Sequence, residues 1–151
     1  MSKKTLVINL GSTSTKLAVY VNTDEVFKET IRHSQEELSV FESVWDQTDF
    51  REGKILDTLK EKNIVLGSLD GIAVRGAALK PIPCGVYVLN EEMIDDMKSG
   101  KYGSHPSNIG NKMAYELGKK LGIPAIIADP PISDEMSKLA KYSGIKGLDR
   151  V

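Results

Sequence analysis

The stretch Val7-Ile8-Asn9-Leu10-Gly11-Ser12-Thr13-Ser14-Thr15-Lys16-Leu17-Ala18-Val19-Tyr20 decides the fold of this chain. Two apolar runs flank a turn of small hydroxyl residues, a pattern that predicts two strands joined by a tight hairpin. Gly11 permits the sharp reversal, and the residues Ser12 to Thr15 place hydroxyls and backbone N–H groups at its tip. Short side chains let backbone N–H groups approach an anion closely, so the tip suits a phosphate, and Lys16 adds a cation beside it.

Two alternatives bear on this hairpin. It is not a Walker loop, because that motif requires Gly, four residues, Gly-Lys-Ser/Thr and a following helix, whereas a strand follows here. The same residues also suit an ordinary hairpin with a Ser/Thr-rich tip, and the pattern alone does not separate that interpretation from a phosphate cradle.

Composition limits the classes of protein to which the chain can belong. Its 151 residues, of which 40% are hydrophobic and 27% charged, suffice for one globular domain with one core. The net charge of −1 and the absence of charge blocks argue against nucleic acid or a membrane surface as a partner. The apolar run Leu6-Val7-Ile8 is too short for a signal or a membrane span, and the single Cys84 fits a reducing compartment. We therefore expect a soluble, cytoplasmic protein.

Downstream of the hairpin, apolar runs and helical periodicities alternate. Three early strands followed by alternating strands and helices are typical of the α/β class. The segment 76–84 contains two prolines and is expected to be a loop. Strands are expected over 5–9, 17–22, 25–32, 70–74, 85–89 and 125–128, and helices over 34–45, 49–63, 90–100, 107–121 and 133–144.

Polar residues stand where expected strands end, and open α/β sheets bind their ligands at such ends. Arg75 leaves a buried strand and can present a bidentate fork to carboxylate or phosphoryl oxygens, although it also suits a surface ion pair. His105 precedes a helix and can donate to an anion there, or it is simply polar surface. Asp129 can hold Mg²⁺ or orient a carboxylate, or it only begins a turn.

Two common hydrolase classes find no support in the sequence. The chain has two histidines and one cysteine, and they do not form a cluster at ligand spacing, so a zinc site is not expected. The sequence also lacks the Gly-x-Ser-x-Gly elbow of a serine nucleophile.

Two motifs resemble the acetate and butyrate kinase family, part of the superfamily of acetate kinases, sugar kinases, heat-shock chaperones and actin. Asn-x-Gly-Ser-x-Ser-x-Lys, from Asn9 to Lys16, is similar to the family's first phosphate motif. The run 75–85, Arg-Gly-Ala-Ala-Leu-Lys-Pro-Ile-Pro-Cys-Gly, resembles the butyrate kinase pattern Arg-Gly-Gly-x-Leu-x-Pro-Ile-x-x-Gly. Ala77 replaces the second glycine, which would crowd the substrate loop if that position requires a positive φ. The resemblance runs from Leu6 to about Gly144.

This resemblance implies a fold and an activity. The fold would be a ribonuclease H-like, actin-type ATPase domain, with a mixed sheet of about five strands that begins with an antiparallel meander and helices on both faces. The activity would be reversible transfer of the γ-phosphoryl group of ATP to a short-chain carboxylate such as butyrate, giving an acyl phosphate and ADP, with Mg²⁺ as cofactor. By resemblance, Arg75, His105 and Asp129 would be catalytic, Asn9, Gly11, Ser12, Thr13, Ser14 and Lys16 would hold phosphates, and Asn9 and Asp129 would serve the metal.

The family's proteins are longer and carry a second, nucleotide-binding domain that nothing in this sequence matches. Residues 1–151 are therefore expected to form a single N-terminal domain that is inactive by itself. The alternative hypothesis is a non-catalytic remnant or fragment that binds phosphate or a protein partner through the exposed inter-domain face. Which short-chain acid is preferred and whether the chain forms a homo-oligomer are left open by the sequence.

Overall fold

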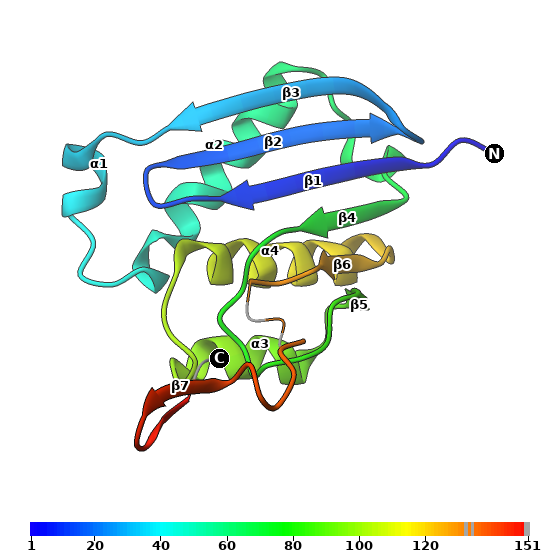
Figure 1. Ribbon diagram of the computed structural model, residues 1–151. Helices are drawn as coiled ribbons and strands as arrows, with labels where there is room; N and C mark the ends of the chain where they lie inside the picture. Colours follow the sequence, from blue (N-terminus) through cyan, green and yellow to red (C-terminus); the bar gives the residue numbers. More distant parts are fainter. Residues whose placement is uncertain (132, 134, 150–151) are drawn as a thin grey trace.

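The computed structural model describes residues 1–131, 133 and 135–149, and it contains one large sheet with helices packed against it (Figure 1). The strands of this sheet run in the order β3-β2-β1-β4-β6-β5. They are β1 (Lys4–Leu10), β2 (Ser14–Val21), β3 (Asp24–Arg32), β4 (Gly71–Val74), β5 (Val86–Val88) and β6 (Ala125–Ala128). The helices are α1 (Gln35–Ser39), α2 (Thr48–Glu61), α3 (Glu91–Ser99) and α4 (Pro106–Leu121), with short 3-10 turns η1 (Trp45–Gln47) and η2 (Leu66–Ser68).

The sheet is mixed, as the resemblance implied. β1, β2 and β3 form an antiparallel meander, β1 pairs in parallel with β4, and β4 pairs in parallel with β6. β5 is antiparallel to β6 and completes a sheet of six strands instead of about five. The expected α/β class and the antiparallel start of the sheet are therefore confirmed.

The core lies between the sheet and α4. Alternation along β1 turns Leu6, Ile8 and Leu10 to one face, where all three are buried. Their cross-strand partners on β2 include Leu17 opposite Ile8, and Leu17 is buried on the same face. Ile109 of α4 is buried in the same cluster, and α4 packs against β1, β4 and β6. A one-residue slip of register would expose this whole set, so the pattern fixes the pairing.

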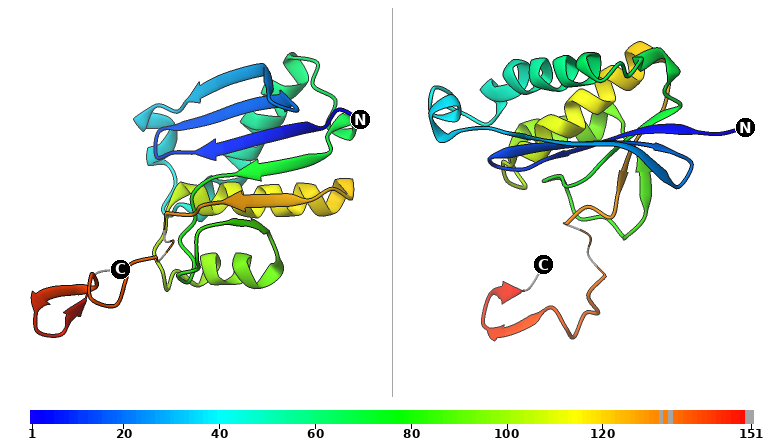
Figure 2. Two further views of the ribbon diagram at one scale, coloured as in Figure 1. Left: turned by 45° about the vertical axis from the view of Figure 1, so that its right-hand side comes forward. Right: turned by 90° about the horizontal axis from the view of Figure 1, so that it is seen from above.

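The positions of the helices correct one expectation. α2 and α4 lie on the same face of the sheet (Figure 2, right), and α3 packs against α4. The chain passes from β3 to β4 through α2, and from β4 to β6 through β5, α3 and α4. Helices on both faces, as expected from the resemblance, are not found in the described part of the chain.

The helix expected over 34–45 is shorter than its apolar spacing indicated. Ser34 and Glu37 form the expected capping box, yet α1 ends at Ser39. No residue of α1 is buried, so tertiary packing does not extend the helix. Phe41 instead packs its ring against Phe50 of α2, with the ring centroids 5.5 Å apart.

The last expected helix, over 133–144, is also wrong for the described residues of that segment; residue 134 lies outside them. Residues 135–137 have neither helix nor strand, turns follow to 141, and Tyr142–Ile145 forms strand β7, which pairs with β8 (Leu148–Asp149). This hairpin projects from the sheet (Figure 2). Leu139 is 81% exposed, so its apolar side chain finds no core against which a helix could form.

The remaining expected strands and helices are present, with ends shifted by three residues or fewer. Asn90 caps α3 by accepting from the backbone N–H of Met93, and Gly100 and Gly122 close α3 and α4 in the left-handed conformation. Within the described residues, no helix is long and apolar enough to cross a membrane.

Packing of α4 on the sheet predicts opposite effects for two helical glycine substitutions. A Cβ added to Gly118 would lie 2.9 Å from the carbonyl oxygen of Ile123 and 3.2 Å from Cβ of Ala125. We expect Gly118→Ala to lower the free energy of unfolding by about 1–3 kcal/mol, because backbone must move to admit the methyl group. Gly53→Ala in α2 is the matched control. A Cβ there meets nothing within 4 Å, so it should raise stability by about 0.5–1 kcal/mol. Urea denaturation measures both, and equal gains would contradict the close packing of α4.

Candidate functional site

The sheet topology brings the expected polar segments to one edge. β1, β4 and β6 are parallel, so their carboxyl ends lie together, at the left of Figure 1. The hairpin tip follows β1, Arg75 follows β4 and Asp129 follows β6. α4 runs back across the sheet, so its first residue lies at this same edge and its cap His105 joins the group. This arrangement is the one in which open α/β sheets form their ligand sites.

The hairpin tip presents backbone donors outward. Gly11 N–H donates to the carbonyl oxygen of Ser14 (2.8 Å), which closes the turn. The carbonyl oxygens of Gly11 and Ser12 accept from the guanidinium of Arg51, at 3.1 and 2.8 Å. Ser12 and Thr13 are exposed, and in the described part of the chain their backbone N–H groups donate to no protein acceptor. Two adjacent free donors are what a phosphate-binding turn requires.

Asn9 and Lys16 flank this tip. They are cross-strand partners on β1 and β2, and they project from the sheet face opposite α4, because their neighbours Leu10 and Thr15 are buried on the α4 side. Asn9 is half-buried and Lys16 is exposed. Within the residues described, neither side chain has a hydrogen-bonding or ionic partner, so both can reach a ligand.

The loop that carries Arg75 is held by the first turns of α4. The side-chain nitrogen of Asn111 donates to the carbonyl oxygen of Gly76 (2.6 Å), and the side-chain oxygen of Asn108 accepts from Ala78 N–H (2.8 Å). Arg75 itself is exposed, and its guanidinium has no partner among the described residues. A loop backbone held in place and a guanidinium without a protein partner suit Arg75 to bind a ligand.

The departure at Ala77 turns out to be accommodated. Ala77 does not adopt a positive φ, and its small side chain is only 6% exposed in the core. The left-handed conformation falls on Gly76 instead, with φ of 76°. The glycine that the backbone geometry requires is therefore retained, and the predicted crowding does not arise.

His105 is the N-cap of α4. Its Nδ1 accepts from the backbone N–H of Ser107 (3.1 Å) and lies 2.8 Å from the Ser107 hydroxyl oxygen. A ring nitrogen that accepts a hydrogen bond carries no proton, so the imidazole proton is placed on Nε2. His105 is exposed, and this arrangement leaves an N–H donor available at the edge.

The backbone N–H and one carboxylate oxygen of Asp129 form hydrogen bonds to Gly85. The φ of Asp129 is 40°, its N–H donates to the carbonyl oxygen of Gly85 (2.9 Å), and its Oδ1 accepts from Gly85 N–H (2.8 Å). Asp129 therefore fastens the start of β5 to the end of β6, which is the turn role that the sequence left open. The other carboxylate oxygen has no partner in the described residues and is free to bind a ligand.

The free oxygen donors at this edge are of the kind that Mg²⁺ prefers. The described residues contain no group of three or more His, Cys, Asp or Glu that could hold a metal by themselves. Mg²⁺, however, commonly takes one or two protein oxygen ligands and completes its shell with phosphates and water. The free oxygen of Asp129 and the side-chain oxygen of Asn9 are hard donors of that kind.

Sequence reasoning missed the residues that support the site. Arg51 is fully buried beneath the tip, and Asn108 and Asn111 are buried under the Arg75 loop. A signal existed for Arg51, because it precedes Ile55 and Leu59 at four-residue spacing and so occupies the apolar stripe of α2. A charged residue on such a stripe is buried, so it requires polar partners in the interior.

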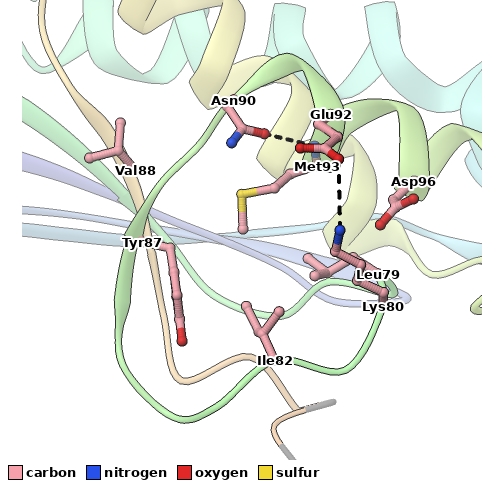
Figure 3. Close-up of a pocket in the computed structure, with 9 residues that line it drawn as sticks. All are labelled: Leu79, Lys80, Ile82, Tyr87, Val88, Asn90, Glu92, Met93 and Asp96. Carbon is pink, nitrogen blue, oxygen red and sulfur yellow. Dashed lines mark hydrogen bonds and ion pairs between the residues drawn. The ribbon is translucent and has the colours of Figure 1, made fainter.

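A separate pocket of about 200 Å³ lies along β5 and α3 (Figure 3). Its wall is largely apolar, with an ion pair between Lys80 and Glu92 at 3.7 Å. None of the expected site residues lines it, so it is distinct from the edge described above. The lining residues are Leu79, Lys80, Ile82, Tyr87, Val88, Asn90, Glu92, Met93 and Asp96.

The order and directions of the strands define the ribonuclease H-like, actin-type fold. The structure superposes on an acetate kinase of Porphyromonas gingivalis with a TM-score of 0.63, at 15% identity, over 95% of this chain and 41% of that one. A propionate kinase of Francisella tularensis gives a TM-score of 0.58, at 14% identity, over 93% and 41% of the two chains. At these identities the likeness shows the fold alone.

The sequence comparison is more specific. The chain is 47% identical to a probable butyrate kinase of Clostridium botulinum over 99% of its own length, and 43% identical to butyrate kinase 1 of Clostridium acetobutylicum over 96%. It spans 42% and 41% of the lengths of these relatives. No protein-family model matches the chain. The resemblance to butyrate kinases drawn from the motifs is confirmed.

The close approach of Gly76 to α4 predicts that Gly76→Ala lowers the free energy of unfolding by more than its left-handed backbone alone would. A Cβ at Gly76 would lie 2.8 Å from Cβ of Ser107, whereas at Gly100, which has φ of 68°, it would meet nothing within 4 Å. Gly100→Ala should cost about 1–2 kcal/mol of unfolding free energy for the left-handed conformation. Gly76→Ala should cost about 1–3 kcal/mol more, because of the contact with α4. Equal losses in thermal denaturation would show that α4 does not constrain this loop.

The buried histidine under the tip predicts a pH dependence of stability. His33 Nε2 lies 2.9 Å from the Thr15 hydroxyl oxygen, and Nδ1 is buried without a partner among the described residues. Burial lowers the pKa of His33, and the cations Arg51 and Lys54 of α2 lower it further, while Glu37 of α1 opposes them. Just below the ordinary histidine pKa of 6.5, His33 is therefore protonated in the unfolded chain but still neutral in the native state.

We expect the free energy of unfolding to fall as the pH drops through about 6.5 towards the lower native pKa of His33. Urea denaturation between pH 7.5 and 5.5 measures this slope. His33→Asn removes the titrating ring, so its slope over the same range should be shallower. An unchanged slope in the variant would assign the pH dependence to other groups.

Proposed function

We propose that this chain is the substrate- and phosphate-binding part of a carboxylate kinase, which transfers the γ-phosphoryl group of ATP reversibly to a short-chain fatty acid such as butyrate. The observation that carries the proposal is the shared edge of β1, β4 and β6, where free backbone donors, a free guanidinium, an imidazole N–H and a carboxylate oxygen gather. Identity of 43–47% to proteins named as butyrate kinases supports the choice of substrate class.

The reaction requires little covalent chemistry from the protein. A carboxylate oxygen of the acid attacks the γ-phosphorus and forms an O–P bond. The bond from that phosphorus to the bridging oxygen breaks, and ADP leaves with the electron pair. Because the carboxylate is already a nucleophile, the protein must align it with the phosphorus and neutralise charge on the transferring oxygens.

We assign these tasks by geometry. The fork of Arg75 would bridge the carboxylate and the transferring phosphoryl group, and His105 would donate from Nε2 to a phosphoryl oxygen. Ser12 and Thr13 N–H groups would hold phosphate oxygens, with Gly11 and Ser14 closing the turn and Asn9 and Lys16 beside it. Asp129 and Asn9 would hold Mg²⁺, which when bound neutralises the charge of the nucleotide phosphates. Asp129 would also orient the acid.

The remaining contacts to nucleotide would come from a second domain. The chain spans 42% of the length of the C. botulinum relative, and clefts in the resembling superfamily lie between two closing domains. We therefore propose that residues 1–151 form one domain and that this domain alone turns over little or no substrate. A kinase of this kind would work in the cytoplasm, where ATP is abundant.

A second candidate function rests on one observation. Leu139, Tyr142, Ile145 and Leu148 of the C-terminal segment are exposed large apolar residues. Such a surface suits docking to another protein or domain, which a non-catalytic phosphate-binding module would also use.

A chimera tests the proposed activity. This chain would replace the matching 42% of the C. botulinum relative. The acyl phosphate formed from butyrate and ATP would be trapped with hydroxylamine and measured as the acyl hydroxamate. We expect the chimera to be active and the isolated chain to give no product. Arg75→Gln in the chimera should lower kcat by about 100-fold or more, because the guanidinium no longer neutralises the negative charge on the transferring phosphoryl oxygens.

Lys120→Gln is the control, since Lys120 is an exposed cation at the far end of α4. It should leave kcat within about twofold of the parent chimera. A folded chimera that binds phosphate but makes no acyl phosphate would favour the non-catalytic alternative. Full activity of Arg75→Gln would remove Arg75 from the mechanism.

A further inference from the structure

Arg51 is an unusual residue for a domain core. Its side chain has 0% exposure, and among the described residues no other Lys, Arg, Asp or Glu is buried. No carboxylate pairs with it in that part of the chain; its partners are the Gln47 side-chain oxygen, the Thr15 hydroxyl and two carbonyl oxygens of the tip. Burial lowers the pKa of its guanidinium. A buried cation without a counter-ion costs free energy, so stability alone does not account for it.

The two carbonyl groups that Arg51 binds belong to the peptide units that carry the free donors of the tip. The Gly11 carbonyl shares its peptide unit with Ser12 N–H, and the Ser12 carbonyl shares its unit with Thr13 N–H. In a planar trans peptide the C=O and N–H point in opposite directions. A guanidinium that binds both oxygens from inside therefore turns both N–H groups outward, and hydrogen bonding to each oxygen polarises its unit and strengthens the donor.

Neighbouring contacts fix the guanidinium in this position. Gln47 accepts from Nε at 2.9 Å, and the Thr15 hydroxyl, which lies 3.4 Å from Nη1, also contacts His33 Nε2. The backbone N–H of His33 donates to the Thr13 carbonyl oxygen at 2.9 Å, so this third tip carbonyl is bound as well. The positive charge of Arg51 thus lies directly behind a turn whose outer side offers two donors.

We propose that Arg51 is a positioning residue of the phosphate site: it aims and polarises the Ser12 and Thr13 N–H groups, and an anion bound outside the tip compensates its buried charge. This inference rests on the proposed function, because it assumes that the tip binds phosphate. A lysine would keep the positive charge but could not bind both carbonyl oxygens as the planar guanidinium does. Arg51→Lys therefore separates the effect of geometry from the effect of charge.

Titration with inorganic phosphate and with ATP, followed by the ¹⁵N–¹H signals of Ser12 and Thr13 in this chain, tests the proposal. We expect both signals to shift with saturation in the unsubstituted chain. Arg51→Lys should weaken the affinity at least about tenfold, measured well below its unfolding midpoint and with the Leu17 and Val19 amide signals unchanged. A purely structural role would lower the midpoint and leave the affinity of the folded molecule intact.

Lys54→Gln is the matched control, because Lys54 lies one turn further along α2 and forms a surface ion pair with Glu37 at 3.6 Å. Its phosphate affinity should stay within about twofold of the parent. If Arg51→Lys does not fold, Gln47→Ala keeps the guanidinium but frees its Nε, and it should weaken the affinity about two- to fivefold.

The outcomes separate this inference from the proposed function. If the tip signals respond to phosphate and the folded Arg51→Lys variant binds equally well, the role of Arg51 is overturned while the phosphate site stands. Unchanged affinity of Gln47→Ala would have the same meaning where the lysine variant is unfolded. If the unsubstituted chain shows no response at Ser12 and Thr13, the phosphate site fails and the inference fails with it.

Discussion

Parallel hydrogen bonding between β1, β4 and β6 sets the geometry of both the core and the candidate site. It forces the carboxyl ends of three strands to one edge, and it requires long crossovers that bring α4 back to the same edge. Residues that are 60 or more positions apart in the sequence, such as Gly11 and Arg75, are thereby placed at neighbouring strand ends. The meander β1-β2-β3 adds the hairpin tip as an element that local sequence alone can form.

α4 is the element that joins core and site. Its second turn packs against β1 closely enough that a Cβ at Gly110 would lie 3.1 Å from the Leu10 side chain. Its first turns carry polar residues that hold the backbone after β4. Apolar burial thus fixes the helix, and the helix in turn fixes the loop that presents Arg75. A ligand-binding residue on a loop is precise only when such a support exists.

The tip of the first hairpin shows a different kind of support. Backbone carbonyls there turn inward to a buried guanidinium, which leaves donors outside, whereas the loop after β4 is held by neutral amides. Arg51, which is charged, lies behind the tip that is expected to hold anions. The neutral amides of Asn108 and Asn111 support the loop that carries the charged Arg75.

Local patterns in the sequence determined most of the secondary structure. The strand alternation of β1, the caps at Ser34 and Asn90 and the glycine stop at Gly122 all depend on neighbouring residues, so they could be read without coordinates. The motif from Asn9 to Lys16 and the residues Arg75, His105 and Asp129 were found in the same way, and their roles in catalysis stay predictions.

Only the tertiary structure decided the rest. α2 and α4 share one face of the sheet, residues 142–149 form a hairpin, and the left-handed position is Gly76 and not Ala77. Arg51, Asn108 and Asn111 gained their roles from contacts with backbone 30 or more residues away. Local propensity carries no information about such partners, because the partner exists only after the chain has folded.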